Sequence, residues 1–253
     1  MNAKRLVGIA VLGIAAGLTA FANSGKILLM NDEWTLSDTG FSTGADAGQF
    51  ARNIGSWATG GSTGNFLAYS TNFGLTGSGL SSTMTSAGHS WTVGTATTFN
   101  LPTLSSYNAI FLSGNAADNQ VLINYVNAGG TVILEGGTGW AGSAAEAAQW
   151  NTFLNAFGLG FGSSYNGVEG NIAISNPHTL FQGVNSLYQN NGNDALDINI
   201  SDPNAKVLAS LDGHGLYAVY EQQNRNVPDA SNTLALLSGA IVGVLFLRRR
   251  YFA

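Results

Sequence analysis

The sequence predicts an α/β fold with a mostly parallel sheet, helices on both faces of that sheet, and a β-rich extension at the C-terminal side. Strand and helix patterns alternate over residues 107–157, and short Gly-rich segments connect them. The first strand-like run, residues 26–30, is apolar without alternation, which is typical of a strand buried on both faces. Alternating units of this kind make a parallel sheet that is covered by helices on both sides.

The first part of the chain supplies three predicted strands and two predicted helices. The strand at residues 26–30 is followed by a helix over residues 45–57, where Phe50, Ile54 and Trp57 have helical spacing and glycines follow as a stop signal. A strand at residues 65–70 comes next. A short helix over residues 80–87 then leads into a strand at residues 91–93.

The clearest alternation follows. Residues 107–112 read as a strand, and an apolar stripe from Val121 to Val126 predicts a helix that ends at a Gly pair. Residues 131–134 form the next predicted strand. After a Gly-rich break, helical periodicity returns over residues 144–157.

The last third of the domain changes character. Residues 172–174, 196–200, 207–211 and 216–220 read as strands, with no long helix between them. An antiparallel extension of the sheet is therefore expected.

The N-terminal 22 residues have the pattern of a secretory signal peptide. Lys4 and Arg5 precede an apolar stretch, and a small-x-small site ends at Ala22, where cleavage is expected. The alternative is an anchor that is not cleaved.

The C-terminal segment combines three features. Val227, Pro228 and Asp229 form a turn, an apolar run of 15 residues follows, and Arg248, Arg249 and Arg250 close it. The run is predicted to be a hydrophobic helix, although it is shorter than the roughly 18 to 20 residues that span a bilayer comfortably. Because flanking arginines stay on the cytoplasmic side, the preceding chain is expected outside the cytoplasm. The predicted domains are thus residues 1–22, 23–223 and 224–253.

Composition limits the chemistry of the central domain. Residues 23–223 hold three basic residues, Lys26, Arg52 and Lys206, against 13 acidic ones, which argues against a nucleic-acid partner. The chain has no Cys, so disulfides, thiolate metal sites and a cysteine nucleophile are excluded. Its three histidines are widely spaced, and neither a metal nor a cofactor is expected.

The C-terminal motif, apolar run and arginine cluster together resemble the VPDSG-CTERM branch of the PEP-CTERM sorting signals. The resemblance implies a signal peptidase and an exosortase-type enzyme as partners, and transient contact with the inner membrane of a Gram-negative bacterium. It also implies delivery to the envelope surface or the extracellular matrix. Ala230 and Ser231 stand where the family has Ser and Gly. An ordinary C-terminal membrane anchor is the alternative interpretation.

A second resemblance concerns the central domain. Residues 107–112, the helix end at 125–130, the strand at 131–134 and the segment 176–184 are similar to the class I glutamine amidotransferase-like superfamily, including its ThuA-like branch. The resemblance implies a flavodoxin-like sheet. Active members use a Cys at a sharp turn, which corresponds here to residues 135–139. Without Cys, ammonia transfer by that mechanism is excluded.

Candidate ligand-binding residues follow the ends of three predicted strands, where parallel sheets bind ligands. Acidic residues beside an indole suit a sugar or a cation, a Ser nucleophile would need a nearby base, and glycines at a helix start suit an anion or a polar ligand. A solvated loop, an inert Ser and a structural turn are the respective alternatives. His178, within the family-like segment, is added as a candidate, although a structural hydrogen-bonding role suits it better. The strand-end candidates are Asp32, Glu33, Trp34, Ser113, Asn115, Glu135, Thr138 and Trp140.

Two functions from different classes remain open. The first is an exported, non-catalytic envelope or matrix-associated protein, because the amidotransferase nucleophile is absent and titratable groups are sparse. The second is a carbohydrate-binding or hydrolytic module outside the cytoplasm, with an extracellular polysaccharide as partner. A purely structural surface protein is a third, weaker alternative.

Overall fold

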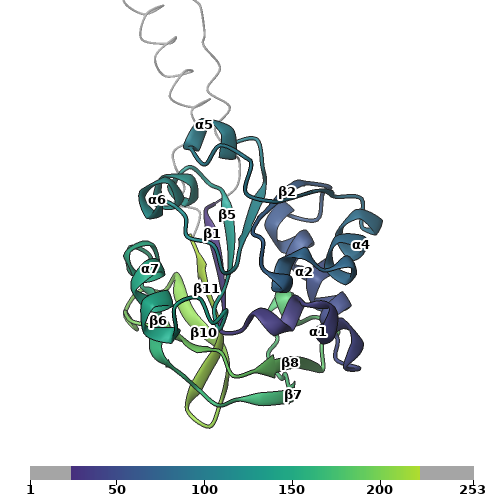
Figure 1. Ribbon diagram of the computed structural model, residues 1–253, viewed down its shortest axis with the longest axis vertical. Helices are drawn as coiled ribbons and strands as arrows, with labels where there is room; N and C mark the ends of the chain where they lie inside the picture. Colours follow the sequence, from purple (N-terminus) through teal and green to yellow (C-terminus); the bar gives the residue numbers. More distant parts are fainter. Residues whose placement is uncertain (1–23, 223–253) are drawn as a thin grey trace, which may run out of the picture.

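The computed structural model describes residues 24–222. Their centre is a seven-stranded sheet (Figure 1). Its strands are β1 (Lys26–Met30), β2 (Asn65–Tyr69), β3 (Ser90–Val93), β4 (Ala109–Leu112), β5 (Thr131–Glu135), β10 (Ala205–Leu211) and β11 (His214–Glu221). They lie in the order β10-β11-β1-β5-β4-β2-β3.

Five strands, β1, β5, β4, β2 and β3, run parallel to one another. Strand β11 pairs antiparallel with β1, and β10 pairs antiparallel with β11. The mostly parallel sheet and its antiparallel extension are therefore confirmed. A flavodoxin-like sheet has the strand order 2-1-3-4-5. If β2 is counted as the first strand, the neighbours β3-β2-β4-β5 have the flavodoxin-like order 2-1-3-4. The fifth position differs, because it is taken by β1, which comes first in the chain.

Helices cover both faces of the sheet (Figure 1). Those that pack on one face include α2 (Ala47–Thr59) and α4 (Ser78–Ser86), and those on the other include α6 (Asn119–Asn127) and α7 (Ser143–Asn155). Shorter helical segments are η1 (Glu33–Leu36), α1 (Asp38–Ser42), α3 (Phe73–Thr76), α5 (Leu101–Leu104) and η2 (Thr179–Phe181).

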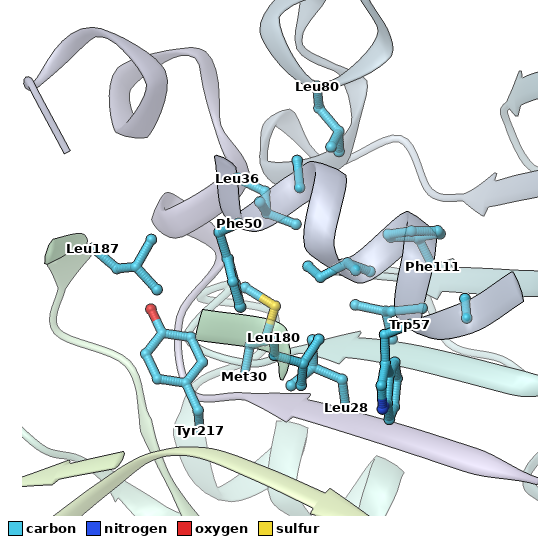
Figure 2. Close-up of a cluster of buried hydrophobic side chains, with 14 of the residues drawn as sticks. Leu28, Met30, Leu36, Phe50, Trp57, Leu80, Phe111, Leu180, Leu187 and Tyr217 are labelled. Carbon is cyan, nitrogen blue, oxygen red and sulfur yellow. The ribbon is translucent and has the colours of Figure 1, made fainter. Parts of the chain in front are cut away.

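The alternation of side chains along β1 explains this two-sided core. Leu28 and Met30 point to the α2 side, whereas Ile27 and Leu29 point to the α7 side, and all four are fully buried. Figure 2 shows Leu28 and Met30 among side chains that include Phe50 of α2. A strand buried on both faces must be apolar at its buried positions, and the four buried residues of β1, Ile27 to Met30, are all apolar.

Four strands lie outside the main sheet, and the sequence predicted them poorly. Strand β6 (Leu159–Tyr165) pairs with β9 (Asn193–Asp197), and β7 (Glu169–Ala173) pairs with β8 (Ser186–Asn190). The predicted strand at residues 196–200 is wrong beyond Asp197, and the one at 172–174 is the end of a longer strand. The strand ends at Asp197, and beyond it Ile198 and Ile200 are 50% and 92% exposed.

No helix within residues 24–222 is long and apolar enough to cross a membrane. The predicted signal peptide and the predicted C-terminal hydrophobic helix lie outside the described residues.

Candidate functional site

The carboxyl ends of the parallel strands meet at one edge of the sheet. The backbone N–H of Gly136, after β5, donates to the Met30 carbonyl of β1 at 2.9 Å. The Ser70 hydroxyl, after β2, donates to the Ser113 carbonyl, after β4, at 2.6 Å. The loops that carry most of the predicted site residues are therefore held side by side.

Asp32 caps the short helix η1 and is fully buried. Its carboxylate accepts the backbone N–H groups of Trp34, at 3.0 Å, and Asn190. Burial raises the pKa of Asp32 to about 6, and these two hydrogen bonds partly oppose the rise. Asp32 thus fixes the loop after β1 onto β8.

Glu33 follows directly and is only 4% exposed. Burial raises its pKa to about 8; the Asn72 side chain opposes the rise, and the charges of Asp32 and Glu146 add to it. The Glu33 carboxyl is therefore mostly protonated at neutral pH and can donate a hydrogen bond.

Glu135, the last residue of β5, is fully buried. Burial raises its pKa well above the usual range, the Ser113 side chain opposes the rise, and Glu33 and Asp32 add to it. Gly74 of α3, which has no side chain, lies against this group, since a Cβ there would stand 2.6 Å from Glu135 Oε2.

Glu146, in the first turn of α7, joins the same group. It is buried, and its carboxylate accepts the Thr138 hydroxyl at 2.5 Å and the Thr138 backbone N–H at 3.3 Å. Burial raises its pKa, these hydrogen bonds oppose the rise, and the charge of Asp32 adds to it. We call Asp32, Glu33, Glu135 and Glu146 the carboxyl cluster.

Several buried polar atoms of the cluster and of its neighbours have no hydrogen-bond partner of good geometry. These are Glu33 Oε2, both carboxyl oxygens of Glu135, Ser113 Oγ, and both side-chain polar atoms of Asn31. A buried polar group without a partner costs about 1–3 kcal/mol. The edge therefore carries hydrogen-bonding capacity that the fold itself leaves unused.

Aromatic side chains surround this edge. The Trp34 ring meets Phe73 edge-on, with ring centroids 4.8 Å apart, and Phe73 is 44% exposed. Trp140 and Tyr165 are each 39% exposed. Burial raises the pKa of Tyr165, and the charges of Glu146 and Glu33 raise it further, so this phenol lies within their field.

A small pocket opens between the loop after β4 and the loop after β5. Its lining combines four polar and four apolar residues, including two indoles, and it is too narrow as it stands to admit a water molecule. The lining residues are Gly114, Asn115, Ala116, Thr138, Trp140, Glu146, Gln149 and Trp150.

The structure thus brings the candidates of all three strand-end loops to one edge. Asn115 serves partly to build it, since its Oδ1 accepts the Thr71 N–H at 2.7 Å and so joins two of the loops. His178 is not part of the site. Its Nε2 lies 3.3 Å from Glu221 Oε2, and Glu221 pairs with Lys26 at the start of β1, on the opposite edge of the sheet.

Ser113 has no histidine to activate it. Each of the three histidines is engaged elsewhere: His89 accepts the Gly64 N–H at 3.0 Å, His178 contacts Glu221, and His214 contacts Asp194 at 2.9 Å. Burial raises the pKa of the neighbouring Glu135 and so disfavours its charged form, which argues against Glu135 as the base for Ser113. The alternative of an inert Ser113 therefore fits the geometry.

Sequence reasoning missed four residues of this edge: Asn72, Phe73, Glu146 and Tyr165. Glu146 carried one signal, because it lies in the first turn of a predicted helix that directly follows the Gly-rich loop. Nothing local marked the other three.

The donor set does not form a metal centre. Within residues 24–222, no group of three or more His, Cys, Asp or Glu side chains is placed to hold a metal ion. All four carboxylate oxygens of Asp32 and Glu146 are already occupied by N–H or O–H donors. What the arrangement offers is a set of neutral or shared carboxyls, hydroxyls and amides beside exposed aromatic rings, which is suited to polar, uncharged ligands.

Residues 226–251 match the VPDSG-CTERM motif. This motif is a sorting signal of exported bacterial proteins, so the chain is an exported protein with a C-terminal sorting signal. No curated protein and no solved structure matches the chain. The resemblance of the central domain to the amidotransferase-like superfamily stays an interpretation.

Proposed function

We propose that this protein is the cargo of an exosortase-type sorting enzyme in a Gram-negative bacterium. In this proposal a signal peptidase removes residues 1–22 and the C-terminal segment holds the chain transiently in the inner membrane. Processing near Val227, Pro228 and Asp229 then releases the domain to the envelope surface or the extracellular matrix.

The single observation that carries this proposal is the motif match over residues 226–251. One further feature supports it. The domain has no Cys, so its stability does not depend on the redox state of the compartment that it reaches. We further propose that the domain is an amidotransferase-like scaffold without ammonia-transfer chemistry, in which the Cys-free turn after β5 has lost the nucleophile.

Mass spectrometry of the protein from cell fractions tests the sorting proposal. We expect the exported form to begin after Ala22 and to lack Arg248, Arg249 and Arg250. A variant with all three arginines changed to Ala should be poorly processed and accumulate as a longer form. Arg225→Ala, just outside the matched residues, is the control and should be processed normally. Exported wild-type protein that retains its arginine cluster would favour a permanent anchor instead.

A carbohydrate-binding or hydrolytic role is the second candidate, and the carboxyl cluster is the observation that favours it. Four acidic side chains converge beside exposed aromatic rings at the edge where parallel sheets bind ligands. A glycan-binding array combined with a polysaccharide hydrolysis screen tests it. Turnover that is lost in Glu135→Gln but kept in the exposed-site control Glu169→Gln would establish catalysis; silence in both assays would remove this candidate.

A further inference from the structure

We infer that the pocket between the loops after β4 and β5 binds a neutral, hydroxyl-rich polysaccharide, with Trp140 and Tyr165 as its stacking surface. This inference rests on the second candidate function and specifies its ligand. The polar half of the pocket lining consists of two amides, a hydroxyl and a carboxyl, from Asn115, Gln149, Thr138 and Glu146, and the apolar half includes the indoles of Trp140 and Trp150. Amide, hydroxyl and carboxyl groups are the partners that sugar hydroxyls need, because each sugar hydroxyl both donates and accepts.

The exposed aromatic residues point to the same place. Eight large hydrophobic side chains are exposed in the described part of the chain, and Phe73, Trp140 and Tyr165 are the aromatic ones among them. Phe73 packs on Trp34 next to Glu33, Trp140 lines the pocket, and Tyr165 lies in the field of Glu146 and Glu33. Exposed aromatic rings that keep one polar end wet are typical of binding surfaces, and their flat faces suit the C–H face of a sugar ring.

Unused hydrogen-bonding groups lie beneath this surface. Ser113 and Glu135 are fully buried and interact with each other, but neither Ser113 Oγ nor the Glu135 carboxyl oxygens have a hydrogen-bond partner of good geometry. Polar side chains left unpaired in a core are costly, so their persistence at this edge favours a ligand-binding role. Entry of a sugar ring requires outward movement of the Trp140 side chain, which is already 39% exposed.

Charge selects a neutral polymer. Residues 24–222 hold only three basic side chains, and none lines the pocket. Lys26 donates to the Trp57 carbonyl at the opposite edge of the sheet, and Arg52 donates to Gln49 on α2. An anionic glycan would find no positive counter-charge among the lining residues, and an interface without complementary charge disfavours it.

Affinity electrophoresis of the purified full-length chain tests this inference. The probes are neutral polymers (laminarin, dextran and hydroxyethylcellulose) and anionic polymers (alginate and polygalacturonate) cast in the gel. We expect at least one neutral polymer to retard the wild-type chain and neither anionic polymer to do so. Trp140→Ala and Tyr165→Ala should each weaken that binding about tenfold, which corresponds to the loss of one stacking contact.

Ile200→Ala is the matched control. Ile200 is 92% exposed and lies in the connection between β9 and β10. This connection leads to Ala205, the first residue of β10, which pairs with Tyr220 at the opposite edge of the sheet. Substitution of Ile200 should therefore leave the retardation unchanged. Thermal unfolding of every variant separates lost binding from lost folding.

Each other outcome overturns the inference. No retardation by any polymer would remove both the inference and the carbohydrate function. Retardation by anionic polymers alone would overturn the neutral-ligand inference but leave a carbohydrate function standing. Retardation that Trp140→Ala and Tyr165→Ala leave intact would place the binding surface elsewhere. The sorting proposal is measured in cells on another segment of the chain, so its failure would not affect these results.

Discussion

At the scale of single residues, burial sets the protonation of the carboxyl cluster. Glu33 is only 4% exposed, and its pKa is raised to about 8. Its own loop brings Asp32, α7 brings Glu146, and β5 brings Glu135, all of which are acidic; Asn72 is the neutral side chain that opposes the rise. None of these neighbours is basic, so no positive charge stabilises the ionised form of the buried Glu33 carboxyl. At neutral pH the folded chain therefore keeps the Glu33 proton, whereas the unfolded chain releases it.

This arrangement predicts how stability depends on pH. Between the usual Glu value near 4.5 and about 8, the unfolded chain has lost the Glu33 proton and the folded chain keeps it. The unfolded state thus binds fewer protons, and the free energy of unfolding falls as pH rises across this window, by up to about 1.4 kcal/mol per pH unit for one group. Glu33→Gln should reduce this fall, as measured by urea denaturation at pH 5 and pH 8.

The control for this prediction is Glu169→Gln, on the exposed strand β7. It should leave the pH dependence as it is in the wild-type chain. Asp32, Glu135 and Glu146 also have raised pKa values, so Glu33→Gln should weaken the dependence without abolishing it. Identical pH dependence in Glu33→Gln and wild type would mean that the Glu33 carboxyl is hydrated in solution.

At the scale of elements, two helical glycines predict opposite effects of the same substitution. In α3, a Cβ on Gly74 would stand 2.6 Å from Glu135 Oε2 and 2.8 Å from the Glu33 carbonyl oxygen, which is backbone and cannot turn away. In α2, a Cβ on Gly48 would meet nothing closer than Phe41 at 3.6 Å.

Gly74→Ala should therefore lower the free energy of unfolding by about 1–3 kcal/mol, because overpacking forces the carboxyl cluster apart. Gly48→Ala should raise it by up to about 1 kcal/mol, because Ala is the better helix former. Urea denaturation of the pair measures both. A neutral or stabilising Gly74→Ala would show that α3 can move away from β5.

The predictable elements were those with a long periodic pattern. Over residues 107–157 the alternation of strand and helix gave β4, α6, β5 and α7 to within a few residues. Strands β6 to β9 were harder, because they are half-polar and pair outside the main sheet. Helices of three to five residues, such as α3, are too short for a 3.6-residue period to show.

The same distinction holds for the site. Asp32 and Glu135 could be placed together from sequence, because parallel strands end at the same edge whatever their order. His178 lies apart from them, beside Glu221 of β11, and the sequence could not show this because the antiparallel pairing of β11 with β1 is a long-range feature. Glu146 was hidden within the apolar stripe of a helix, where the pattern gave no reason to expect a buried acid.

At the scale of the whole molecule, two apolar cores share one sheet. The core on the α2 side and the core on the α7 side draw alternate residues from the same strands, for example Leu28 and Leu29 of β1. With no disulfide available, packing across the sheet must supply the stability of the domain. If the strands of the sheet separated, the side chains of both cores would be exposed to water together.

This shared sheet predicts one cooperative unfolding transition. Leu28→Ala and Leu29→Ala should each lower the free energy of unfolding by about 2–5 kcal/mol, since both side chains are fully buried, while Ile198→Ala, at a half-exposed side chain, should change it little. Hydrogen exchange of α2 and α7 amides checks cooperativity: either substitution should lower the opening free energy of both helices equally. If Leu28→Ala weakened α2 alone, the two faces would be separate folding units, and the carboxyl cluster would lie at a boundary between them.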